Sequence, residues 1–118
     1  MSKFEIFHNP ACSKSRQTLA LLRSLGIEPR QRLYLQDAPD EKTIRFLVKA
    51  LNADVRSLLR SSEAAYQEAG LDDQNLSEQQ LINALLENPK LLQRPIVISG
   101  NRAVIGRPPE NVLALIDN

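Results

Sequence analysis

The hydrophobic pattern near the N-terminus changes from a short apolar run to a helical repeat. The segment from Phe4 to Phe7 has the alternation and residue types of a strand. The amphipathic stretch that follows predicts a helix from about Ser15 to Leu25, which Gly26 is placed to end. A second strand is predicted around Arg32 to Leu35. The chain therefore begins with a β-α-β unit.

The middle of the chain has the periodicity of helices. Asp40 is a residue type that caps helix N-termini, and apolar residues recur at helical spacing after it. These positions are Ile44, Leu47, Val48 and Leu51. Shorter helical segments are predicted around Val55 to Leu59 and Ala64 to Ala69. Ser77 with Gln80 resembles a capping box and opens another helix. The residues that this helix is expected to bury are Leu81, Ile82, Leu85 and Leu86.

The C-terminal part returns to β-structure. After a short helical turn beyond Asn88-Pro89, the runs 96–98 and 103–105 flank Gly100-Asn101, which predicts a hairpin. Pro108-Pro109 then begins a final helix. Its apolar residues are Val112, Leu113 and Ile116. The full order is β-α-β, a helical insertion and β-β-α, which predicts a thioredoxin-like α/β fold whose reactive loop follows the first strand.

Length and composition narrow the class of protein. A chain of 118 residues is predicted to form a single domain over 1–118. It contains one cysteine, so an internal disulfide is excluded, and we see no charged-then-apolar leader or long apolar run. We therefore expect a cytoplasmic protein that does not enter a membrane. The net charge of +1 gives no general case for nucleic-acid binding, so any anion recognition must be local.

The single cysteine, Cys12, lies where the strand-to-helix loop meets the predicted helix. Backbone N–H groups and the positive end of the helix dipole favour a thiolate at such a position. Lys14 and Arg16 add positive charge, and His8 is a further hydrogen-bonding group. The hypothesis is a reactive thiol with a pKa below the ordinary value of about 8.5. The alternative is a small buried side chain, which free cysteines often are.

The neighbours of Cys12 exclude some kinds of chemistry. His8 is the only histidine, so a structural zinc site lacks ligands and we expect no bound metal. Ser15 occupies the second cysteine position of a Cys-x-x-Cys pair, so an oxidised Cys12 needs an outside thiol. A tyrosine-phosphatase loop needs an arginine six residues after its nucleophile, but that residue is Thr18.

Three arginines are candidates for oxyanion binding: Arg60, Arg94 and Arg107. If the C-terminal hairpin pairs beside the first strand, Arg94 and Arg107 approach the Cys12 loop. The planar guanidinium group suits a tetrahedral oxyanion better than the point charge of a lysine does. For each arginine the alternative is a solvated surface side chain or a structural ion pair.

Several separated motifs extend over nearly the whole chain. They are His8-Asn9-Pro10-Ala11-Cys12 with Ser15-Arg16, Tyr34-Leu35, the segment from Val55 to Arg60, Asn88-Pro89, the segment from Arg94 to Val97, and Gly106-Arg107-Pro108. In this order they resemble the glutaredoxin-dependent arsenate reductase family. The resemblance implies that Cys12 is the nucleophile and that His8 and Ser15 tune its thiolate. It also implies that the oxyanion is bound by Arg60, Arg94 and Arg107.

The resemblance further implies an activity. It is an oxidoreductase reaction of arsenic detoxification, in which arsenate is reduced to arsenite through a covalent Cys12 adduct. Glutathione is the expected co-substrate and glutaredoxin the expected partner, with no bound cofactor. Ser13-Lys14 stands where members with established arsenate activity typically carry Gly-Thr, and the chain stops at Asn118, before their longer tail. It therefore resembles a less characterised branch.

Two alternatives follow from the same superfamily. One is a glutathione-linked thiol oxidoreductase that reduces mixed disulfides and binds oxyanions only incidentally. The other is a non-enzymatic transcription regulator similar to the RNA-polymerase-binding Spx protein, although Ser15 removes the internal Cys-x-x-Cys switch that some of those regulators use.

Overall fold

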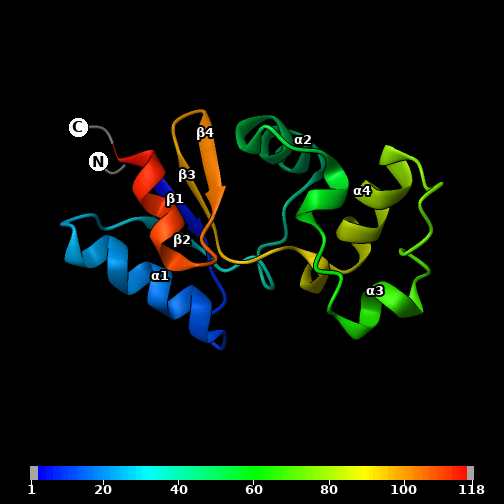
Figure 1. Cartoon of the computed structure of the whole chain (residues 1–118), viewed down its shortest axis with the longest axis horizontal. Coiled ribbons are helices and arrows are strands. Elements are labelled where there is room, and N and C mark those ends of the chain that lie inside the picture. The colour runs from blue at the N-terminus through cyan, green and yellow to red at the C-terminus, as the bar shows by residue number, and fades with distance from the viewer. Residues whose placement is uncertain (1–2, 117–118) are drawn as a thin grey trace. The chain divides into compact units, whose positions relative to one another are not determined.

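The computed structural model describes residues 3–116 and divides the chain into two compact units (Figure 1). The sheet unit comprises residues 3–37 and 94–116, and the helical unit comprises residues 38–93. Every strand of the described residues lies in the sheet unit, and the helical unit is inserted between its two segments. This is the predicted thioredoxin-like α/β order of elements, which is confirmed.

The sheet unit is built on a mixed sheet with the strand order β2-β1-β3-β4. Strand β1 (Phe4–Phe7) pairs in parallel with β2 (Arg30–Arg32) and antiparallel with β3 (Ile96–Ser99), which pairs in turn with β4 (Arg102–Ile105). The predicted hairpin is thus confirmed, with Gly100 in the left-handed region at φ 64°. The pairing of Phe7 with Ile96 brings the segment before β3 beside the loop that leaves β1.

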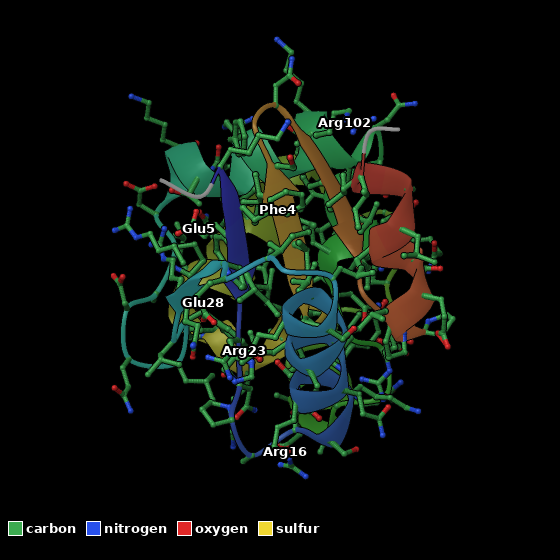
Figure 2. The ribbon with its side chains drawn as sticks, turned by 90° about the vertical axis from the view of Figure 1, so that its left-hand side faces the viewer. Phe4, Glu5, Arg16, Arg23, Glu28 and Arg102 are labelled. Carbon is green, nitrogen blue, oxygen red and sulfur yellow. The ribbon has the colours of Figure 1, made fainter. Side chains whose placement is uncertain are left out.

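Helix α1 (Ser13–Ser24) connects β1 to β2 and lies on one face of the sheet, as Figure 2 shows. It begins two residues before the predicted start, because the Cys12 carbonyl already accepts from the Arg16 N–H at 3.0 Å. Gly26 ends the helix as predicted, at φ 81°, and the Ile27 N–H returns to the Leu22 carbonyl at 3.0 Å.

The core of the sheet unit lies between this helix, the sheet and the C-terminal segment. Its buried members are Ile6, Leu19, Leu22, Val97, Val112 and Leu115. The last two belong to η3 (Pro109–Leu115), a 3-10 helix with three residues per turn. That period places Val112 and Leu115 on one face and turns Leu113 outward, where it is 50% exposed. Of the apolar residues named for the final helix, Val112 is therefore buried and Leu113 is exposed.

The second strand differs from its predicted position. Strand β2 covers Arg30–Arg32, so it overlaps the predicted segment 32–35 only at Arg32. The parallel pairing stops there because β1 ends at Phe7, and the His8 N–H makes the last bond to the Arg32 carbonyl at 2.8 Å. The chain then turns, with the Gln36 N–H bound to the Leu33 carbonyl at 2.9 Å. Without a partner strand, the β-propensity of this segment does not decide its structure.

The helical unit contains α2 (Glu41–Leu51), η1 (Val55–Leu58), α3 (Ala64–Glu68), α4 (Glu78–Glu87) and η2 (Pro89–Leu91). The predicted caps are confirmed: Asp40 accepts from the Thr43 N–H at 2.8 Å, and Ser77 with Gln80 forms a complete capping box. Each cap stabilises its helix by about 1 kcal/mol. Within residues 3–116 no helix combines the length and the apolar character that crossing a membrane requires.

Helix α4 buries one fewer residue than predicted. Leu81, Ile82 and Leu85 are buried, but Leu86 is 38% exposed. Successive residues of a helix are turned by about 100°. The buried stripe is centred near Leu85, so Leu86 falls outside it.

Candidate active site

The loop between β1 and α1 positions Cys12 at the N-cap of the helix. The Asn9 side chain accepts from the Ala11 N–H at 3.0 Å, and the Asn9 carbonyl accepts from the Cys12 N–H at 2.9 Å. The loop is also closed by Arg16, whose Nη1 donates to the Pro10 carbonyl at 2.8 Å. The thiol is half-buried and carries no disulfide. It therefore lies at a helix N-terminus, as predicted.

The surroundings of the thiol lower its pKa. Burial raises the pKa of Cys12, but this effect is outweighed by hydrogen bonds from the Ser15 N–H, the Arg94 side chain and the Lys14 N–H, and by the charge of Arg94. The net pKa of the Cys12 thiol lies below its ordinary value. A larger fraction of the group is thus the thiolate, which is the nucleophilic form. The contribution of Lys14 comes from its backbone rather than its side-chain charge.

His8 and Ser15 form a buried pair behind the loop. The His8 Nδ1 lies 2.7 Å from the Ser15 Oγ, which also accepts from the Asn9 N–H at 3.1 Å. The pKa of His8 is lowered by burial and by the charges of Arg23 and Arg16, which favours the neutral imidazole. His8 thus contacts Ser15, and the Ser15 N–H contacts Cys12.

The arginines Arg94 and Arg107 occur in the sheet unit, at the two ends of the β-hairpin. Arg94 precedes β3 and its side chain donates to the Cys12 thiol. Arg107 follows β4 and is exposed, and its carbonyl accepts from the Asn111 side chain at 3.2 Å. The peptide bonds from both arginines to the following prolines, Pro95 and Pro108, are cis. Arg94 thus acts on the thiol, whereas the roles of Arg94 and Arg107 toward an oxyanion stay predictions.

Arg60 belongs to the helical unit. Its Nη1 lies 3.7 Å from the Glu63 carboxylate, and its backbone N–H donates to the Leu91 carbonyl at 2.7 Å. Its role toward an oxyanion stays a prediction. Within residues 3–116 no group of three or more His, Cys, Asp and Glu side chains is arranged to hold a metal ion.

One buried polar residue near this loop was not recognised from the sequence. Thr18 has no exposed surface, and its hydroxyl lies 2.8 Å from the Gly106 carbonyl and 2.9 Å from the Lys14 carbonyl. A tyrosine-phosphatase loop would carry an arginine at this position, and the sequence indicated no other role for Thr18. A signal was nevertheless present, since Thr18 is a polar residue on the helix face that also carries Ser15 and Leu22, both fully buried.

Comparisons with known proteins agree over the whole of this region. The model of the ArsC family matches residues 7–115. An arsenate reductase of Haemophilus influenzae is 46% identical over 112 residues, which cover 94% of this chain and 97% of that protein. The uncharacterized protein YfgD of Escherichia coli is 50% identical over 113 residues, or 95% of each chain. The solved structure of an arsenate reductase from Vibrio cholerae superposes with a TM-score of 0.93 at 44% identity, covering 96% of this chain and 97% of that chain.

Proposed function

The chain belongs to the ArsC family, and from that membership we propose that it reduces arsenate to arsenite. One observation carries the proposal: the Cys12 thiol has a lowered pKa and is hydrogen-bonded by the Arg94 side chain. A thiolate beside a guanidinium group combines a nucleophile with a binding group for an oxyanion. Relatives named arsenate reductase, such as the Haemophilus influenzae protein, support this substrate.

In the first step the Cys12 thiolate attacks the arsenic atom. A sulfur–arsenic bond forms while an arsenic–oxygen bond breaks, and the oxygen leaves as hydroxide, or as water if it carries a further proton. Arg94 and Arg107 bind the remaining oxygens and stabilise the charge that rearranges during the displacement. Arg60 is proposed as a third oxyanion-binding arginine, which rests on the family motif that contains it.

In the second step glutathione supplies the other thiol. Its thiolate attacks the Cys12 sulfur, and the sulfur–arsenic electron pair passes to arsenic, which is reduced from As(V) to As(III) and leaves as arsenite. The two sulfurs are oxidised together to a mixed disulfide. A glutaredoxin thiol then attacks the glutathione sulfur and releases the Cys12 thiol. An external donor is required because the chain has no second cysteine.

His8 and Ser15 are proposed to prepare the thiol for attack. The Ser15 hydroxyl lies 2.7 Å from the His8 Nδ1, and this contact holds Ser15, whose backbone N–H stabilises the Cys12 thiolate. We also propose that residues 1–118 act as a single arsenate-reductase-like domain in the cytoplasm. The match of one family model to residues 7–115, which include both units, supports the single domain.

The proposal is tested by arsenite formation with glutathione and glutaredoxin. We expect Cys12→Ser to abolish turnover while leaving the thermal unfolding midpoint nearly unchanged, because serine is almost isosteric with cysteine. The matched control is Ser13→Ala, which changes the adjacent exposed residue and should keep activity. Substantial arsenate reduction by Cys12→Ser would exclude the mechanism. Turnover of glutathione mixed disulfides without arsenate reduction would favour the thiol oxidoreductase instead, and binding of RNA polymerase with neither activity would favour the regulator.

A further inference from the structure

Thr18 connects backbone segments that belong to different parts of the site. Its hydroxyl has one proton, which is shared between the carbonyls of Lys14 and Gly106 at 2.9 and 2.8 Å. Lys14 lies in the first turn of α1, and its N–H stabilises the Cys12 thiolate. Gly106 directly precedes Arg107. The hydroxyl therefore joins the helix turn beside the thiol to the residue before an arginine.

The packing around this hydroxyl is close. A Cβ atom at Gly106 would lie 2.8 Å from the Thr18 Cγ2 and 3.1 Å from the Pro95 ring, so a larger residue would not fit here unless Thr18 or Pro95 moved. The Gly106 N–H also donates to the Pro95 carbonyl at 2.8 Å. Pro95 follows Arg94, whose side chain donates to Cys12. Thr18 and Gly106 thus lie at the junction of the segments that carry the thiol and both arginines.

We propose that Thr18 is a positioning residue for oxyanion binding: its hydroxyl holds the Gly106 carbonyl against α1 and thereby fixes Arg107 relative to the Cys12 thiol. This inference rests on the proposed function, because it assumes that Arg107 binds the oxyanion. The Gly106 bond is the important one. The bond from Thr18 to the Lys14 carbonyl is the common bond of a helical hydroxyl to the carbonyl four residues earlier, which has little effect on stability. That carbonyl also accepts a backbone hydrogen bond of the helix. The bond to Gly106 spans 88 residues of sequence and has no such local substitute.

The test measures anion binding without requiring turnover. Cys12 is alkylated with iodoacetamide at increasing arsenate concentrations, without glutathione. The half-protecting concentration, at which bound arsenate halves the rate of alkylation, is determined for each variant. Thr18→Val keeps the branched shape and removes the hydroxyl, and we expect the half-protecting concentration to rise about tenfold, the loss expected for one hydrogen bond. Thr18→Ser restores the hydroxyl and should remain within about twofold of the original chain. Ser99→Ala removes a buried hydroxyl at the other end of the sheet and should leave protection unchanged.

A second set of variants tests whether the effect passes through Arg107. In an Arg107→Ala chain, Thr18→Val should change the half-protecting concentration by less than about twofold, since coupled residues are not additive. The inference is overturned if Thr18→Val has the same half-protecting concentration as the original chain, or if Thr18→Ser raises this concentration as much as Thr18→Val does. It is also overturned if Thr18→Val still raises the concentration about tenfold in the Arg107→Ala chain. Failure of the original chain to reduce arsenate, with this pattern of protection intact, would count against the proposed function and not against the role of Thr18.

Discussion

The sheet unit and the helical unit use arginine for different purposes. By sequence, the sheet unit (residues 3–37 and 94–116) has nine Lys and Arg residues against four Asp and Glu, whereas the helical unit has six against nine. In the sheet unit, Arg94 donates to the Cys12 thiol. In the helical unit, Arg56 donates to the Tyr66 hydroxyl at 2.8 Å and to the Leu71 carbonyl at 2.6 Å. Arg94 of the more basic unit therefore faces a nucleophile, whereas Arg56 of the more acidic unit is used in the packing of its own unit.

This difference shows that residue type alone does not identify a binding arginine. Arg45, like Arg56, is occupied by its own unit: it contacts Glu41 at 3.0 Å and Glu78 at 2.7 Å, and so links α2 to α4. Arg23 pairs with Glu28 in the sheet unit, where Figure 2 shows them side by side near the C-terminal end of α1. What distinguishes Arg94 is the group that its side chain contacts, a thiol with a lowered pKa.

The largest effect is expected from Arg94→Lys. Lysine keeps the charge but loses the planar fork that would hold both the thiolate and an oxyanion. Loss of a charge-assisted contact of about 1.5–3 kcal/mol lowers kcat/KM roughly 10- to 150-fold. The thermal unfolding midpoint should change little. Kinetics and thermal unfolding are measured on the same preparation, and activity that falls only in proportion to the folded fraction would return Arg94 to a structural role.

Smaller effects are expected from substitutions of two arginines of the helical unit, and they distinguish a structural arginine from one that binds arsenate. Arg56→Lys should lower the free energy of unfolding by about 2 kcal/mol, because its fork binds several groups at once, and should leave KM for arsenate unchanged. Arg60→Lys should raise KM for arsenate up to about tenfold with little effect on stability. Urea unfolding and steady-state kinetics of both variants decide this. If Arg60→Lys behaves like Arg56→Lys, Arg60 is a structural residue.

The smallest expected effect is a shift in the titration of the thiol. The hydrogen bonds from Ser15, Arg94 and Lys14 favour the thiolate, so the apparent pKa of Cys12 should lie below the ordinary value of about 8.5. The sign follows from linkage. A thiol whose folded pKa lies below its unfolded pKa contributes stability above the unfolded value, and loses it as the pH falls through the folded value.

The pH dependence of iodoacetamide alkylation measures this pKa. The rate should begin to fall at a lower pH than it does for an ordinary thiol, because the pKa of Cys12 is lowered. Arg94→Lys provides the matched comparison and should move the apparent pKa upward, because it removes the donor fork while the backbone donors remain. An apparent pKa at or above about 8.5 in the original chain would show that Cys12 is not activated.

Much of the fold could be predicted from the sequence because its signals are local. The apolar run 4–7, the cap at Asp40, the capping box at Ser77 and the turn at Gly100 each act within a few residues, and each is found as predicted. The misplaced second strand depended on something non-local. Residues 33–35 do not continue β2 because β1 ends at Phe7, and that limit is set by the sheet rather than by their own propensity.

The candidate site divides in the same way. The position of Cys12 at a helix N-terminus was determined by the sequence, since the loop and the helix are contiguous with it. The contact between Arg94 and Cys12, and the bond between Thr18 and Gly106, join segments more than 80 residues apart. These contacts exist only because β3 pairs beside β1, and no local pattern in a single sequence specifies which distant residues such pairing brings together.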